Sequence, residues 1–184
     1  MKETHAMGLD NFPATYPCVS AGTAVTEQVA DRQQIDCNAT MSAGGCPWKN
    51  ANPPGGVMVG MMGTYCWIRG KVYAHLIEQV LDMDVNELWG DLTPGQCHEL
   101  AEDVEQRYRH PRAAAAITAY AHAQFAEDQV IREAYVEKTG TPFPVENTHD
   151  TSEALAVSVR EKIEYFVWYL RWVADEGNGM AAWS

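Results

Sequence analysis

Apolar side chains recur at helical spacing in four segments of the chain, and all four follow residue 63. The first segment begins at Thr64, whose hydroxyl can cap a helix, and ends near Leu81. Apolar positions four residues apart give it one continuous stripe, and a second row widens that stripe. The stripe consists of Ile68, Val72, Leu76 and Val80, widened by Tyr65, Tyr73, Ile77 and Leu81.

The second segment has the strongest helix-start signal in the chain. Residues 93–96, Thr-Pro-Gly-Gln, combine an N-cap, proline at the first helical position and glutamine three residues after the cap. His110-Pro111 ends this helix, because proline cannot continue it. The positions predicted to face inward are Cys97, Leu100, Ala101, Val104 and Tyr108, so Cys97 is interpreted as a core residue.

A third helix is predicted to begin at Pro111, which is well suited to the first helical position. An alanine-rich run follows it, and Gly140 is the expected end. The inward positions of this helix are predicted to be Ile117, Tyr120, Ala121, Gln124, Val130 and Ile131.

The fourth segment, from about Thr151 to Glu176, has the longest apolar stripe. Asp150 and Glu153 form a second capping pair at its start, and Gly177 is the expected stop. Its inward positions are predicted to be Leu155, Val159, Ile163, Phe166, Val167, Leu170 and Val173.

The chain before the first helix has a different character. Residues 1–63 show no helical or strand period, and prolines and glycines interrupt them repeatedly. At the other end, residues 178–184 can form one strand, for which residues 6–10 are the expected partner. The sequence therefore predicts a mainly α fold of about four helices in one domain spanning the whole chain. A loop-rich, Cys-containing amino-terminal arm (1–63) precedes a helical body (64–177), and a short two-stranded ribbon joins the two ends.

Composition narrows the classes of function. The 184 residues are 46% apolar, which is enough to bury a core. A net charge of −12 disfavours unaided binding to nucleic acid, because the mean field repels polyanions, so the expected partner is another protein. No run of 18 apolar residues is present, and the opening residues lack the apolar core of a secretory signal. The expected compartment is the cytoplasm, with no membrane association.

Four of the five cysteines lie in or beside the arm, at Cys18, Cys37, Cys46 and Cys66. A loop-rich segment of this length needs a staple, and four thiolates could hold one structural Zn²⁺. Their spacing lacks the close pair of ligands that zinc knuckles supply. Buried unmodified cysteines, a pair of disulfides and an iron–sulfur cluster therefore stay open as alternatives.

Familiar catalytic signatures are missing from the sequence. His98-Glu99-Leu100-Ala101-Glu102 resembles a zinc-protease helix, but glutamate stands where the second histidine must be. Nucleophile-elbow, phosphate-loop and dinucleotide motifs are absent as well. One enzymatic hypothesis stays open, a small hydrolase or transferase with a cleft around Cys66, Arg69, Lys71 and His75. In that cleft Arg69 and Lys71 would bind a phosphate or carboxylate.

Three stretches and the Trp-rich last helix resemble a loose group of uncharacterised small proteins encoded by tailed phages and prophages. The stretches are residues 7–12 (MGLDNF), 63–71 (GTYCWIRGK) and 92–97 (LTPGQC). The resemblance implies a phage-type accessory protein acting in the host cytoplasm, and it transfers no catalytic residue. The leading hypothesis is thus a non-enzymatic accessory or protein-binding module with a Zn-stapled arm. The enzyme and a virion structural component are the alternatives.

Overall fold

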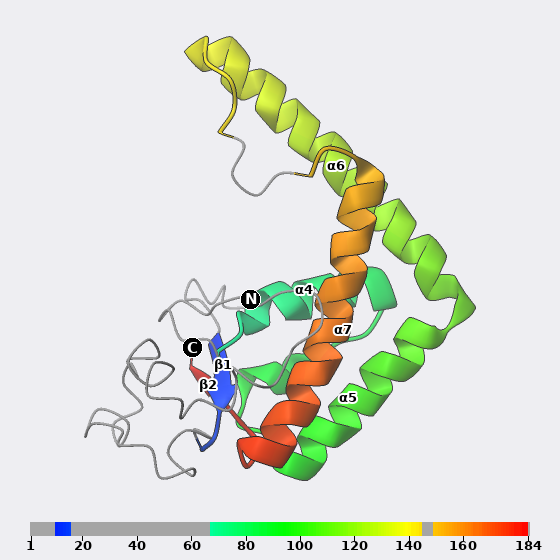
Figure 1. The fold of residues 1–184 in the computed structure, drawn as a ribbon, viewed down its shortest axis with the longest axis vertical. Helices are drawn as coiled ribbons and strands as arrows, with labels where there is room; N and C mark the ends of the chain where they lie inside the picture. Colours follow the sequence, from blue (N-terminus) through cyan, green and yellow to red (C-terminus); the bar gives the residue numbers. More distant parts are fainter. Residues whose placement is uncertain (1–9, 16–66, 145–148, 184) are drawn as a thin grey trace, which may run out of the picture.

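The computed structural model describes residues 10–15, 67–144 and 149–183, and most of them are helical, as predicted. Figure 1 shows α5 and α7 side by side, with α4 packed near them and the far half of α6 extending beyond the other elements. The elements are β1 (Asp10–Pro13), α4 (Gly70–Leu81), the 3-10 helix η2 (Asn86–Trp89), α5 (Pro94–Arg109), α6 (Pro111–Thr139), α7 (Ser152–Glu176) and β2 (Met180–Trp183). In these ranges no helix has both the length and the apolarity needed to cross a membrane.

Helix α7 supplies the centre of the core and packs against both α5 and α6. One row of its buried apolar residues alternates steps of four and three, which keeps that row on one face of the helix. That stripe is Val159, Ile163, Phe166, Leu170 and Val173. Cys97 on α5 is fully buried, which confirms its interpretation as a core residue. Burial raises the pKa of its thiol to about 11, so it stays protonated and unreactive at neutral pH.

The predicted capping box at the start of α5 is confirmed. Gln96 N donates to Thr93 Oγ1 at 3.3 Å, and Thr93 N donates to Gln96 Oε1 at 2.9 Å. The predicted Asp150 and Glu153 capping pair is wrong, because Thr151 caps α7 by accepting from Ala154 N at 3.1 Å. The Thr151 hydroxyl stands three residues before that amide, the separation that an N-cap side chain spans.

Helix α4 begins at Gly70, six residues later than predicted. Ile68 N donates to Asn11 O at 2.8 Å and Asn11 N donates to Ile68 O at 2.9 Å, so the backbone of Ile68 belongs to a β-bridge rather than to a helix. Thr64, the predicted cap, lies outside the described residues. Val72 was expected to face inward, but 40% of it is exposed.

The predicted ribbon between the two ends of the chain is present as an antiparallel pair. Asp10 pairs with Trp183 and Pro13 with Met180, so β1 covers residues 10–13 and includes Asp10 of the predicted strand 6–10. Residues 6–9 lie outside the described part of the chain. Isolated bridges, Asn11 to Ile68 on one side and Leu92 to Met180 on the other, widen this ribbon.

Asn11 is the polar centre of the ribbon and is completely buried. Its side-chain amide Nδ2 donates to Leu88 O at 2.8 Å, and the Tyr169 hydroxyl donates to Asn11 O at 3.3 Å. The single residue thereby joins β1 to η2, α7 and the segment that leads into α4.

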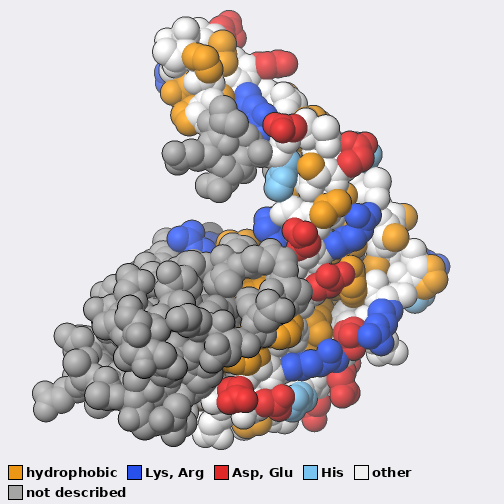
Figure 2. All heavy atoms as spheres, viewed as in Figure 1, with side chains coloured by type: hydrophobic (Ala, Val, Ile, Leu, Met, Phe, Trp, Pro, Cys, Tyr) orange, Lys and Arg blue, Asp and Glu red, His pale blue; other side chains and the backbone are white. Residues whose placement is uncertain are grey.

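The far half of α6 departs from the predicted pattern. Val130 and Ile131 were expected to face the core, but they are 66% and 51% exposed. Figure 2 shows apolar side chains at the surface of this projecting part, interspersed with charged ones. The loop after α6 returns beside it, where Tyr135 meets Phe143 edge to face at 5.2 Å and Arg132 Nη2 donates to His149 O at 3.4 Å. The 29-residue helix extends past the core. The helical period alone therefore could not predict that these side chains are exposed.

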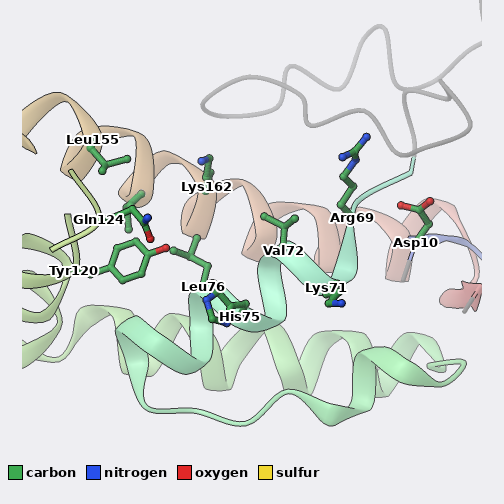
Figure 3. A pocket seen from close by; sticks show the side chains of 11 residues that line it. Asp10, Arg69, Lys71, Val72, His75, Leu76, Tyr120, Gln124, Leu155 and Lys162 are labelled. Carbon is green, nitrogen blue, oxygen red and sulfur yellow. The ribbon is translucent and has the colours of Figure 1, made fainter. Parts of the chain in front are cut away.

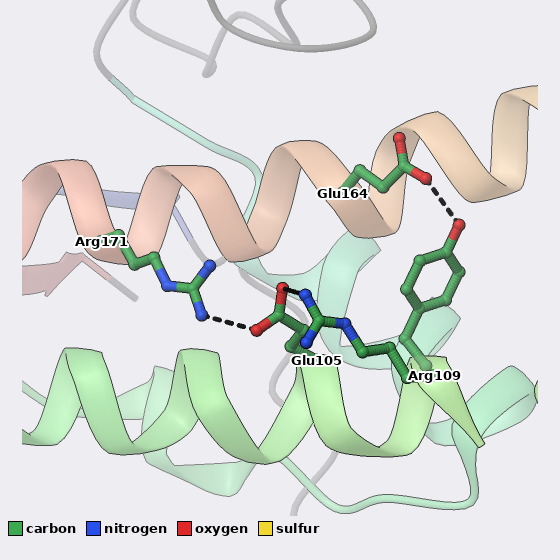
Figure 4. A network of polar contacts seen from close by, with 5 residues as sticks. Glu105, Arg109, Glu164 and Arg171 are labelled. Carbon is green, nitrogen blue, oxygen red and sulfur yellow. Dashed lines mark hydrogen bonds and ion pairs between the residues drawn. The ribbon is translucent and has the colours of Figure 1, made fainter.

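Charged side chains bridge α5 and α7 (Figure 4). Glu105 accepts from Arg171 and from Arg109, each at 2.7 Å. The Tyr108 hydroxyl donates to Glu164 Oε1 at 2.7 Å, and burial together with that carboxylate raises the pKa of Tyr108 to about 12. The hydrogen bond from Arg171 lowers the pKa of Glu105.

Replacing Glu105 by glutamine is expected to reduce stability at neutral pH by up to about 1 kcal/mol, the usual range for partly exposed pairs. A carboxylate with a lowered pKa stabilises the fold above its unfolded value of about 4.3, and that contribution is lost as the pH falls through the folded value. The difference in free energy of unfolding between wild type and Glu105→Gln should therefore shrink as the pH falls below about 4.3 and vanish below the lowered pKa, as urea unfolding curves will show. Glu102→Gln, on the exposed face of the same helix, is the control. A stability difference between wild type and Glu105→Gln that did not depend on pH would contradict the lowered pKa of Glu105.

Gly179 admits no side chain where the chain enters β2. Its φ is +96°, and a Cβ there would overlap the carbonyl oxygen of Leu92. Gly179→Ala is expected to lower the free energy of unfolding by about 2 to 5 kcal/mol. The left-handed backbone accounts for about 1 to 2 kcal/mol of this loss and overpacking for about 1 to 3 kcal/mol. Gly140→Ala is the matched control, because Gly140 also has a positive φ of +67° but faces open space. Urea unfolding followed by circular dichroism measures both, and equal losses would refute the steric argument.

Candidate functional site

A cavity of about 610 Å³ lies between α4, α6 and α7. Figure 3 shows the side chains of these helices converging on it, together with that of Asp10 from β1. Ligand-binding pockets commonly measure roughly 300 to 1,000 Å³, so the cavity is large enough for a small organic molecule.

Pairs of residues four apart build the cavity wall, because such residues lie on the same face of a helix. Helix α4 contributes Val72 and Leu76, and α7 contributes Leu155 and Val159. These four side chains make the apolar part of the wall. Each helix thus exposes one short apolar row to the same space.

Helix α6 adds a polar pair to the wall, Tyr120 and Gln124. In Figure 3 the Tyr120 ring reaches from α6 toward Leu76 on α4. Burial, followed by the negative charges of Asp128 and Glu127, raises the pKa of Tyr120. Its hydroxyl is therefore protonated at neutral pH and can donate a hydrogen bond into the cavity.

Positive side chains line the same space, at Arg69 and Lys71 near the start of α4 and at Lys162 on α7. None of the three makes an ion pair or hydrogen bond within the described residues. Arg171 behaves differently, since Glu105 neutralises it. The cavity therefore collects cations that no described side chain neutralises, in a chain whose net charge is −12.

The start of α4 adds to this positive potential. Arg69 occupies the N-cap position without a side-chain cap, and the first turn has no acidic residue. The amides of Val72 and Tyr73 donate to Arg69 O, at 2.9 and 3.3 Å, whereas those of Gly70 and Lys71 have no acceptor among the described residues. Free amides and the helix dipole both favour a negative charge at this point.

One acidic side chain, Asp10, belongs to the described lining. It is a buried residue of β1, and Figure 3 places it at the same end of the cavity as Arg69. Arg69 and Lys71 outnumber it at this end, so the described side chains there carry a net positive charge.

The structure brings together Arg69, Lys71 and His75, three of the four residues proposed for an enzymatic cleft. In Figure 3 Arg69 lies on one side of α4, and Lys71 and His75 lie on the other. The fourth, Cys66, lies outside the described residues. So do Cys18, Cys37 and Cys46, and the structural Zn²⁺ site stays a prediction.

Lys162, Tyr120 and Gln124 were missed as site residues. Tyr120 and Gln124 had been placed on the inward face of α6, and a glutamine within an apolar stripe is a signal that such a face borders a cavity or a polar partner. Lys162 follows Val159 by three residues on the cavity face of α7. No local pattern connects it to α4, because the two segments meet only in the folded chain.

In the part of the chain that the structure describes, no group of three or more His, Cys, Asp or Glu residues could hold a metal ion. His98, which begins the protease-like stretch, contacts Asp175 on α7 at 3.0 Å.

No protein-family model matches the chain, and neither a curated protein nor a solved structure shows significant similarity to it.

Proposed function

We propose that this protein is a non-enzymatic binding module and that the cavity between α4, α6 and α7 holds a small, largely apolar ligand. The observation that supports the proposal is the cavity itself, about 610 Å³ with an apolar wall drawn from α4 and α7. Small-molecule sites typically combine such a wall with a few polar groups, here Tyr120 and Gln124. Both can form hydrogen bonds that orient a ligand.

His75 is the one histidine among the described residues that line the cavity. A catalytic base must lie within hydrogen-bond reach of a nucleophile or of an orienting group. Within the described residues, His75 makes no hydrogen bond to a hydroxyl, thiol or carboxylate.

A small hydrolase or transferase is the second candidate, because Arg69, Lys71 and His75 do line one cavity. Its thiol would be that of Cys66. Turnover of a chromogenic ester that is abolished by His75→Ala would favour this candidate over the binding module.

The phage-type accessory role, the Zn-stapled arm, the protein partner and the virion alternative stay predictions. A ligand site in the helical body is compatible with each of them. The cavity involves α4, α6 and α7, whereas the proposed zinc ligands belong to the segment that precedes α4.

Filling the cavity should abolish ligand binding. Val72→Trp introduces a large side chain at a residue that is 40% exposed and lines the cavity. We expect the dissociation constant for the neutral fluorophore N-phenyl-1-naphthylamine to rise at least about tenfold, equivalent to about 1.4 kcal/mol. Fluorescence titration of the full-length protein measures it.

Val157→Trp is the matched control, because Val157 is 49% exposed and lies on α7 outside the cavity lining. Its circular dichroism and its affinity for the fluorophore should equal those of the wild type. Absence of saturable fluorophore binding by the wild type, or equal affinities of the two tryptophan variants, would refute the proposed site.

A further inference from the structure

We infer that the ligand of this cavity is a small organic anion, with one anionic head group at the start of α4 and an apolar body between the three helices. This inference rests on the proposed function and adds the chemical class of the ligand. It depends on the distribution of charge within the cavity, to which the folded chain adds Lys162 beside the Arg69 and Lys71 already expected from the sequence.

The cavity is polarised from end to end. Figure 3 shows Arg69, Lys71 and Asp10 near one end of it, Leu155, Tyr120 and Gln124 near the other, and Lys162 between them. An amphipathic ligand would match this polarity, with its charge near Arg69 and its apolar part against Leu155. A neutral apolar ligand would leave the cations without a partner.

The three cations of the cavity lining have no partner among the described residues. Arg69, Lys71 and Lys162 make no ion pair or hydrogen bond in the described part of the chain, and Asp10 is the single carboxylate of the described lining. A bound anion therefore need not displace any described side chain from these groups. With a chain charge of −12 the mean field repels anions, so their retention requires a local cluster of this kind.

The backbone contributes at the same place. The amides of Gly70 and Lys71 have no acceptor among the described residues, and α4 carries neither a capping side chain nor an acidic residue in its first turn. An anionic head group would accept from these amides and interact favourably with the helix dipole. The cavity, the cations and the uncapped helix start are separate observations that favour the same ligand charge.

A carboxylate and a phosphate monoester share the required chemistry, since either can accept two hydrogen bonds from an arginine side chain. Displacement of N-phenyl-1-naphthylamine by decanoate, decyl phosphate and decanol compares the two head groups with a neutral analogue of the same chain length. At low ionic strength we expect at least one of the two anions to bind about tenfold or more tightly than decanol. The preference should weaken in 0.5 M NaCl, because salt screens exposed charges.

Arg69→Gln/Lys71→Gln is expected to remove most of that preference while the affinity for decanol stays unchanged. The decanol measurement reports an intact cavity, so a loss of folding cannot imitate the result. Lys138→Gln, at an exposed position of α6 outside the cavity lining, is the matched control for a change of net charge. It should leave the preference intact.

The outcomes separate the two proposals. Equal affinities for decanol and both anions would overturn the anion inference and leave the cavity as an apolar site. An equal effect of Lys138→Gln and the double substitution would overturn it as well, because the preference would then reflect net charge. Displacement by none of the three compounds, together with no saturable binding of the fluorophore, would overturn both proposals.

Discussion

The buried position of Asn11 is the constraint on which the rest of the arrangement depends. Its backbone pairs with Ile68, its side-chain amide donates to Leu88 O, and its carbonyl accepts from Tyr169. Burying an amide without partners costs several kcal/mol, so the segments around Asn11 must keep these positions together. Because Ile68 is held in this bridge, the helix starts only at Gly70. That start places Arg69 and Lys71 beside the cavity.

The cavity follows from how three helices meet around that start. Helix α7 is the central helix, and its apolar stripe packs against α5 and α6. Tyr73 on α4 stacks on Phe166 of α7 at 5.1 Å, which anchors α4 against the central helix. The adjacent rows, Val72 with Leu76 and Leu155 with Val159, border the cavity instead of filling it. Apolar walls then meet cations that have no partner among the described residues, a combination suited to an amphipathic anion.

Some features of the fold follow from local rules and were predictable. The capping box of Thr93 and Gln96, the break at Pro111 and the end of α6 at Gly140 each depend on residues within one turn of a helix. Other features were not predictable, because a long-range contact competes with a local preference. Helix α4 starts later than the local pattern predicts because Ile68 pairs with Asn11 in a β-bridge. Val130 on α6 is exposed because that helix extends past the core.

The sequence by itself determined the mainly helical class, the boundaries set by proline and glycine, the core role of Cys97 and the ribbon that joins the ends of the chain. It also singled out Arg69, Lys71 and His75 as neighbours, because they lie within seven residues of one another. Only the tertiary structure brought Lys162, Tyr120 and Gln124 to them. The helical period predicts which residues share a face of one helix. Which of those faces another helix covers depends on packing between segments that are distant in the sequence.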